Sequence, residues 1–335
     1  MDGGGAELAT QAPGVSVAQQ ELSRRVKTKL ERELGPLVCD LLQDENVIEI
    51  MLNPDGKLWV ERFGEPMKVV GCMPESQARS LMGTVAATLE VAITAQNPIL
   101  ECELPFDGSR FEALLPPIVQ RPTFSIRKKA VRVFSLADYV SSGIMTATQR
   151  EIIERAVLAR KNILVVGGTG SGKTTLTNAI IHSMGEQCPE HRLITIEDTG
   201  ELQCEVLNVV ALRAVEYVTM TQLLRATMRL RPDRIVVGEV RGKEALALLK
   251  AWNTGHPGGV ATVHANSAPA GLIRMEQLVA EATQAPMYSL ISEAVNLIVS
   301  IGKVPHVGRR ILEVVSVEGH DGNNYLTKPI TNTEE

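Results

Sequence analysis

The chain has 335 residues, of which 44% are hydrophobic and 22% charged, a composition typical of a globular protein with about two domains. Its formal net charge of −5 excludes a basic field over the whole surface that would hold DNA, and an aromatic content of 3% disfavours a stacking platform for single-stranded nucleic acid. The spacing of the five scattered cysteines excludes a zinc ribbon and indicates reduced thiols. The sequence shows neither a secretory signal nor an apolar run long enough to cross a membrane, so we expect a cytoplasmic protein.

The first half of the chain predicts a small domain of mixed helices and strands. We expect a flexible tail over 1–16 and an α+β domain over 17–130. The domain starts with a helix, because apolar residues recur every four positions from Leu22 to Leu34 before Gly35-Pro36 breaks the pattern. Strand-like runs joined by tight turns follow, and a second helix is expected over about 75–89. Further strands are expected at ILECELP, RFEALLPP and TFSIRKK.

The second half alternates strand-like and helix-like segments. The segment 131–148 has no clear period and is expected to be a linker, after which the pattern changes at Gln149. Alternation of strands and helices predicts a mostly parallel sheet covered by helices, closed by two more helices and a terminal hairpin. The predicted fold class is therefore α/β, with a RecA-like P-loop domain over 149–330 and a short tail over 331–335.

The segment GGTGSGKTT predicts a phosphate-binding loop. Its spacing, Gly167-x-x-x-x-Gly172-Lys173-Thr174, is that of the P-loop, and it lies between a buried strand-like run and an amphipathic helix pattern. Glycines let successive backbone N–H groups point into one hollow at a helix N-terminus, where anions are favoured. We expect Lys173 on the β- and γ-phosphates of ATP and Thr174 on Mg²⁺. The residues expected to hold the nucleotide here are Gly167, Gly168, Thr169, Gly170, Ser171, Gly172, Lys173, Thr174 and Thr175.

Carboxylates follow two of the predicted strands in this half. Glu239 ends RIVVGEV, where it would hold Mg²⁺ together with Thr174 or polarise the attacking water. Glu197 and Asp198 end LITIED, and Glu201 follows in the next loop, so that one of these acids is expected to orient water as a general base. The tripeptide DTG also suits a simple turn, and which acid is the base stays open.

One histidine and three arginines complete the candidate site. His264 follows the strand GVATV and is expected to sense the γ-phosphate, whereas His256 is expected to be a loop residue. Arg241 comes just after the glutamate strand and would reach a phosphate. Arg110 and Arg127 in the first domain would neutralise phosphate charge from the opposite side, although a solvated charge on a strand is an equal alternative from sequence alone.

Four motifs stand in one order along the chain: GGTGSGKT, ITIEDTGEL, RIVVGEVRG and TGHPGGVATVHAN. Together they resemble the secretion ATPase family, the motors of type II secretion, type IV secretion and type IV pili, over roughly 17–330. The stretch 224–267 is most similar to the conjugal-transfer branch, the Trb-type ATPases, and the chain lacks the four-cysteine insert that type II relatives often carry.

The resemblance implies a homohexameric ATPase that uses ATP and Mg²⁺. It implies work on a type IV secretion or conjugation apparatus, for pilus assembly and transfer of DNA or protein, with docking on inner-membrane components. Direct DNA binding is not expected, because the chain has an acidic balance and few aromatic residues. The resemblance also implies that nucleotide lies between the two domains of a subunit, which favours phosphate contacts for Arg110 and Arg127. The basic segment SRRVKTKLER suggests a peripheral contact with anionic lipid, although a solvated helix face is the commoner explanation.

Other functions stay open at this point. A tight-adherence or type IV pilus motor belongs to the same family, and a nucleotide-gated scaffold would bind ATP with little turnover. A kinase would need an acceptor pocket and an arginine-rich lid, for which no clear segment is found. A DNA-translocating motor is disfavoured by the acidic balance and the few aromatic residues.

Overall fold

The computed structural model describes residues 17–62, 65–128, 133–305 and 307–330, with side chains from Arg24 onward. The tails expected at the two ends, and the side chain of Leu22, lie outside the described residues. The chain divides into two compact units, Met1–Val131 and Arg132–Glu335, each with its own sheet. Among the described residues, no helix combines the length and the apolar character needed to cross a lipid bilayer.

The N-terminal unit is built on a six-stranded antiparallel sheet with the strand order β3-β2-β1-β6-β5-β4. Its first and last strands along the chain, β1 and β6, pair in the middle, where Ile50 lies opposite Ile126. Buried and half-buried residues alternate along β5 and β6, because one face of the sheet is packed and the other is open. The strands are β1 (Val47–Leu52), β2 (Lys57–Arg62), β3 (Lys68–Cys72), β4 (Ile99–Glu103), β5 (Arg110–Leu114) and β6 (Thr123–Arg127).

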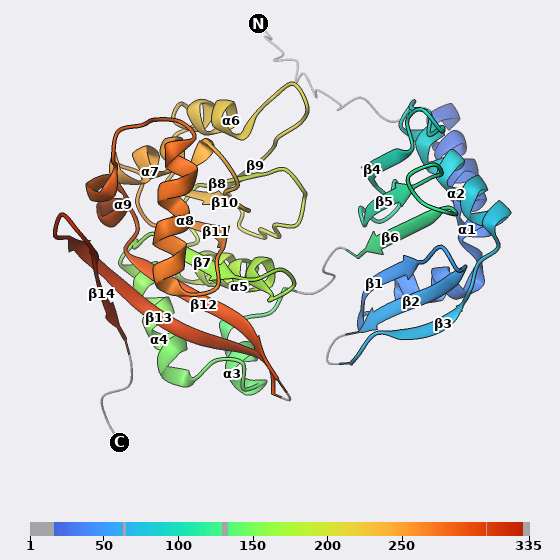
Figure 1. Ribbon diagram of the computed structural model, residues 1–335. Coiled ribbons are helices and arrows are strands. Elements are labelled where there is room, and N and C mark those ends of the chain that lie inside the picture. Colours follow the sequence, from blue (N-terminus) through green and yellow to red (C-terminus); the bar gives the residue numbers. More distant parts are fainter. Residues whose placement is uncertain (1–16, 63–64, 129–132, 306, 331–335) are drawn as a thin grey trace, which may run out of the picture. The chain divides into compact units, whose positions relative to one another are not determined.

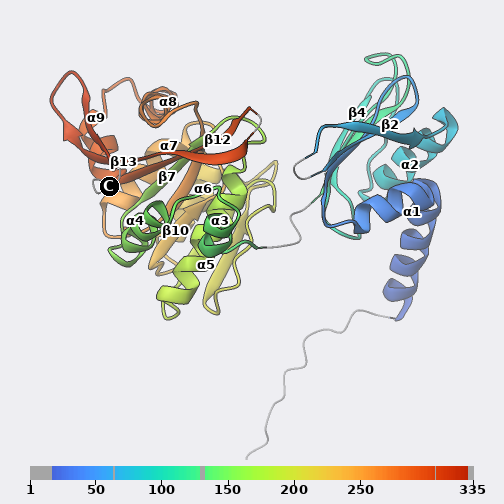
Figure 2. The ribbon, with the colours of Figure 1, turned by 90° about the horizontal axis from the view of Figure 1, so that it is seen from below.

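Two helices, α1 (Val17–Gln43) and α2 (Glu75–Thr88), cover the packed face of this sheet (Figures 1 and 2). Leu30, Leu34 and Leu81 from these helices are buried in the core against the sheet. The predicted break at Gly35-Pro36 is a kink within α1: Gly35 has a φ of 77°, outside the helical region, and the helix resumes after it.

The C-terminal unit contains an eight-stranded sheet with the order β14-β13-β12-β7-β11-β10-β8-β9. The strands from β12 to β9 run parallel, and β13 and β14 add an antiparallel edge, which confirms the α/β class. The strands are β7 (Ile163–Gly167), β8 (Leu193–Glu197), β9 (Val209–Arg213), β10 (Arg234–Val237), β11 (Val260–His264), β12 (Leu297–Val304), β13 (Gly308–His320) and β14 (Tyr325–Pro329).

Helices cover both faces of this sheet (Figure 1). Alternate residues of β7 enter two separate cores: Leu164 and Val166 pack with α7, α8 and α9, whereas Ile163 and Val165 pack with α4 and α5. The fully buried run that the sequence shows before the glycines is thus a central strand with helices on each side. The helices are α4 (Ala147–Leu158), α5 (Lys173–Gln187), α6 (Met220–Thr227), α7 (Glu244–Asn253), α8 (Ala268–Ala280) and α9 (Tyr288–Ala294).

The segment expected to be a linker, 131–148, contains structure of its own. Helix α3 (Leu136–Ser141) begins with a capping box formed by Ser135 and Asp138, and α4 begins inside the same segment. Leu136 and Tyr139 are buried in the core that contains α4 and α5. Six residues are too few to display a helical period, so the sequence pattern did not reveal α3.

Candidate functional site: the carboxyl edge of the parallel sheet

A glycine-rich loop joins the end of β7 to the start of α5. β7 ends at Gly167 and α5 begins at Lys173, so the loop leads directly into a helix N-terminus. The φ angle is +66° at Gly170 and +99° at Gly172, conformations that side chains disfavour. A Cβ at Gly167 would overlap the backbone of β12, whereas a Cβ at Gly168 would meet no atom within 4 Å. Geometry therefore requires glycine at three of these four positions.

Lys173 folds back over this loop. Its Nζ donates hydrogen bonds to the carbonyl oxygens of Gly167 at 3.0 Å and Gly168 at 3.1 Å, which holds the ammonium group against the expected phosphate site. The remaining hydroxyl side chains of the loop and the first turn differ in exposure: Thr169 is exposed, Thr175 is half-buried and Ser171 is buried.

Thr174 lies in the first turn of α5 and contacts an acid from the next strand-end loop. Its Oγ1 lies 3.2 Å from Oε2 of Glu201, to which it donates. One helical turn later, Asn178 fixes the same loop, because its Nδ2 donates to the Glu201 carbonyl at 3.1 Å and its Oδ1 accepts from the Gln203 N–H at 3.0 Å. A hydroxyl and a carboxylate side by side are oxygen donors of the kind that Mg²⁺ prefers. Sequence reasoning paired Thr174 with Glu239, but the acid beside Thr174 is Glu201.

Glu197 is buried and its carboxylate faces backbone groups. Oε2 accepts hydrogen bonds from the N–H groups of Glu201 at 2.6 Å and Leu202 at 3.0 Å. A Cβ on the neighbouring Gly238 would come within 3.0 Å of the Glu197 Cβ, so the two strand ends are closely packed. In this geometry Glu197 orders the loop that carries Glu201.

Glu239, Arg241 and Asp198 form a partly exposed ion-pair cluster beyond the ends of β10 and β8. Arg241 Nη2 lies 2.8 Å from Glu239 Oε2, and Nη1 lies 2.7 Å from Asp198 Oδ2. Burial lowers the pKa of Arg241, but the hydrogen bond to Glu239 and the nearby acids outweigh it, so the pKa lies above its usual value. We expected Arg241 to contact a phosphate, but in this structure it orients Glu239 and Asp198, two of the acids predicted to be catalytic.

His264 is exposed at the end of β11, next to the glycine loop. In the parallel pairing of β11 with β7 it lies opposite Gly167. The strand order β7-β11-β10-β8 then places Gly167, His264, Glu239 and Glu197 in succession along one edge of the sheet. His256 is half-buried in the loop between α7 and β11.

Arg110 and Arg127 lie in the N-terminal unit, directly opposite one another on β5 and β6. Both are half-buried on the open face of the sheet. The next residues across the sheet are acidic, with Glu103 opposite Arg110 and Glu49 opposite Arg127. Like charges that face one another across strands repel, and the flanking glutamates partly offset that repulsion.

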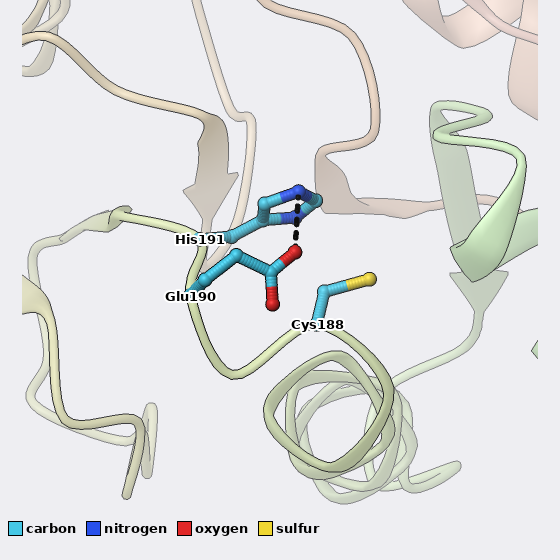
Figure 3. Close-up of side chains that lie close together, drawn as sticks. All are labelled: Cys188, Glu190 and His191. Carbon is cyan, nitrogen blue, oxygen red and sulfur yellow. Dashed lines mark ion pairs between the residues drawn. The ribbon is translucent and has the colours of Figure 1, made fainter.

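A second group of chemically active side chains lies at the C-terminal end of α5. The potential metal-ligating atoms of Cys188, Glu190 and His191 lie within 4.8 Å of one another (Figure 3). The fully buried Arg234 donates from Nε to His191 Nδ1 at 2.9 Å and from Nη2 to Cys188 Sγ at 3.3 Å. Because Nδ1 accepts, the neutral ring carries its proton on Nε2, which faces Glu190 at 3.4 Å and has no lone pair for a metal. The cluster is therefore organised around a buried arginine.

Two contacts of this candidate site were not predicted from sequence. Glu201 was considered as one of several acids, but nothing in the pattern placed it on Thr174. Arg309 on β13 donates from Nη2 to the Gly170 carbonyl at 3.3 Å, and the sequence carries no signal for this contact because it depends on long-range strand pairing.

Comparisons with known proteins identify related chains. A family model described as "Type II/IV secretion system protein" matches residues 31–312. The probable conjugal transfer protein TrbB of Sinorhizobium fredii (strain NBRC 101917 / NGR234) is 51% identical over 311 residues, which cover 93% of this chain and 95% of the relative. The conjugal transfer protein TrbB of Rhizobium radiobacter is 50% identical over 311 residues, 93% of this chain and 96% of the relative.

Among solved structures, the crystal structure of the pilus retraction motor PilT with bound ADP is similar. It aligns with a TM-score of 0.58 over 87% of this chain and 80% of that chain. The sequence identity is 21%, so this likeness concerns the fold alone.

Proposed function

The chain belongs to the type II/IV secretion system protein family, and from this membership and the geometry of the glycine loop we propose that it hydrolyses Mg²⁺·ATP to drive a type IV secretion or conjugation apparatus. Membership confirms the resemblance noted in the four sequence motifs and makes the chain a secretion ATPase. The metal, the residue roles and the coupling to transport are the proposal.

The observation that carries nucleotide binding is the loop over the start of α5. Left-handed glycines and the N–H groups of a helix N-terminus would form an anion site, and the loop carbonyls hold the ammonium group of Lys173 beside it. With ATP bound, Lys173 would exchange its two carbonyl partners for oxygens of the β- and γ-phosphates. The remaining loop residues over 167–175 would supply backbone contacts.

The oxygen donors beside the loop fit a magnesium ion. Thr174 and Glu201 would hold Mg²⁺, directly or through water, and the ion would neutralise charge on the phosphates. Glu239 would orient the attacking water, because it lies just beyond the end of β10 on the same edge and Arg241 fixes its carboxylate. Glu197 would position the loop of Glu201, and Asp198 would hold Arg241.

Arg110, Arg127 and His264 would report the state of the γ-phosphate. The repulsion between the facing arginines would be relieved by an anion bound to both, which supports phosphate contacts for the pair. Loss of the γ-phosphate would remove these contacts and so change the conformational equilibrium of the subunit.

The relatives named for conjugal transfer support a role in conjugation. We propose a ring of six copies in the cytoplasm that docks on inner-membrane components of the apparatus, with a peripheral lipid contact through the basic part of α1 and without direct DNA binding. A tight-adherence or type IV pilus motor remains the alternative assignment within the family, and a nucleotide-gated scaffold would differ by its low turnover.

Phosphate release by the purified protein, measured with and without Mg²⁺, tests the proposal. We expect Lys173→Ala to abolish hydrolysis, because it removes the ammonium group that is bonded to the loop carbonyls. The exposed Lys161→Ala is the matched control and should keep the parent rate. Hydrolysis by Lys173→Ala at the parent rate would refute the site assignment, and turnover close to zero in the parent would favour the scaffold.

A further inference from the structure

The hairpin of β12 and β13 extends beyond the end of β7 and runs beside the glycine loop. The last pair between β12 and β7 joins Ser300 to Val166, but β12 and β13 stay paired as far as Val304 and Gly308. Arg309, near the tip of this extension and opposite Lys303, is half-buried and reaches the loop.

Arg309 fixes the orientation of one peptide group in the loop. Its Nη2 donates to the Gly170 carbonyl at 3.3 Å, and a Cβ at Gly172 would lie 3.3 Å from Arg309 Cδ. In a trans peptide the carbonyl and the following N–H point in opposite directions. With the Gly170 carbonyl on Arg309, the N–H of Ser171 faces the inside of the loop, where it donates to the Gly168 carbonyl at 3.3 Å.

The arginine is itself held in place by the hairpin. The N–H of Ile311 donates to the Ile144 carbonyl at 2.8 Å, which ties β13 to the turn between α3 and α4. The guanidinium of Arg310 donates to the Arg309 carbonyl at 2.8 Å and lies near Gly143, away from the glycine loop. Arg309 therefore approaches Gly170 from a braced strand.

We propose that Arg309 is a positioning residue for the nucleotide site, which keeps the Ser171 N–H turned inward so that it can bind phosphate. The inference rests on the proposed nucleotide binding at this loop. It predicts an effect on nucleotide affinity and little effect on the chemical step, because Arg309 contacts the outer side of the loop.

Affinity for a fluorescent ATP analogue, together with KM and kcat for phosphate release, tests the role. Loss of one hydrogen bond from a charged donor should weaken analogue binding and raise KM about tenfold in Arg309→Ala, with kcat within about twofold of the parent. Arg309→Lys should recover most of the affinity, since an ammonium group can also donate to the carbonyl. The exposed Lys161→Ala is the control and should bind like the parent.

The outcomes separate this inference from the proposed function. If the parent protein binds no analogue, the proposed function fails and the inference fails with it. If the parent binds and Arg309→Ala binds equally well, or loses kcat at unchanged KM, the inference alone is wrong. Arg309→Met keeps an unbranched stem but has no donor, and it replaces the alanine variant if thermal melting shows that variant to be unfolded. Parent affinity in Arg309→Met at a parent melting temperature would overturn the proposal.

Discussion

Replacing Arg234 with methionine should strongly destabilise the C-terminal unit. The guanidinium is fully buried, and its donors satisfy the carbonyls of Val157 and Gly258 at 2.9 Å each, besides His191 Nδ1 at 2.9 Å. Val157 lies in the last turn of α4, and Cys188, which also accepts from Arg234, caps the C-terminal end of α5. Arg234 thus bonds the partially negative ends of two helices, one of which carries the glycine loop at its other end.

The expected loss follows from the acceptors that the substitution leaves behind. Two of the closest acceptors, the Gly258 carbonyl and His191 Nδ1, would lose their donor, at a cost of about 1.5–2.5 kcal/mol each within the usual range, whereas the Val157 carbonyl keeps the Arg160 N–H at 3.2 Å. Burial of the charged guanidinium lowers the pKa of Arg234 and is unfavourable, and methionine removes that cost. Methionine cannot, however, donate a hydrogen bond to the acceptors that Arg234 leaves. The free energy of unfolding should therefore fall by about 3–5 kcal/mol, as for a buried charge network that loses one member.

Urea unfolding followed by circular dichroism measures this difference. For a unit of this size a loss of that magnitude should lower the melting temperature by roughly 6–20 °C. The matched control is Arg231→Met, at an exposed arginine in the loop just before β10, which should change stability by less than about 0.5 kcal/mol. A change in Arg234→Met below about 1 kcal/mol would show that the four hydrogen bonds do not act as described.

Three further results are expected. Burial, and then the charge of Arg234, lower the pKa of His191 below its ordinary 6.5, so the parent protein should lose stability as the pH falls below that value. The His191→Asn variant should lose less stability over the same range, and parallel unfolding profiles of the two proteins from pH 7 to 5 would contradict this. Glu201→Gln should raise the Mg²⁺ concentration needed for half-maximal hydrolysis more than Glu239→Gln does, and the reverse order in a magnesium titration would move the metal back to Glu239. Gly172→Ala should lower the stability by about 1–3 kcal/mol in thermal melts, because Gly172 has a φ of +99°. Gly168→Ala should be near neutral, because a Cβ there meets no atom within 4 Å, and equal effects of the two substitutions would show that the positive φ does not require glycine.

Local pattern accounts for most of the fold that was predicted. The apolar periods of helices and the buried runs of strands depend on neighbouring residues, so the alternation of elements and the start of α5 after the glycines follow from the printed sequence. The parallel arrangement follows as well, because strands separated by helices pair side by side with their carboxyl ends at one edge. That rule also predicted that Glu239 and His264 would end strands of the same sheet.

Contacts between distant segments needed the tertiary structure. Arg309 meets Gly170 only because β12 pairs with β7 and β13 with β12, and Arg234 is buried only because α4, α5 and the loop before β11 converge on the start of β10. The sequence by itself determined most of the elements, though not the short helix α3, and which strand ends carry chemical groups. Only the tertiary structure decided that Glu201 is the acid on Thr174, since the path of an irregular loop depends on buried partners such as Glu197 and Asn178 that no local period encodes.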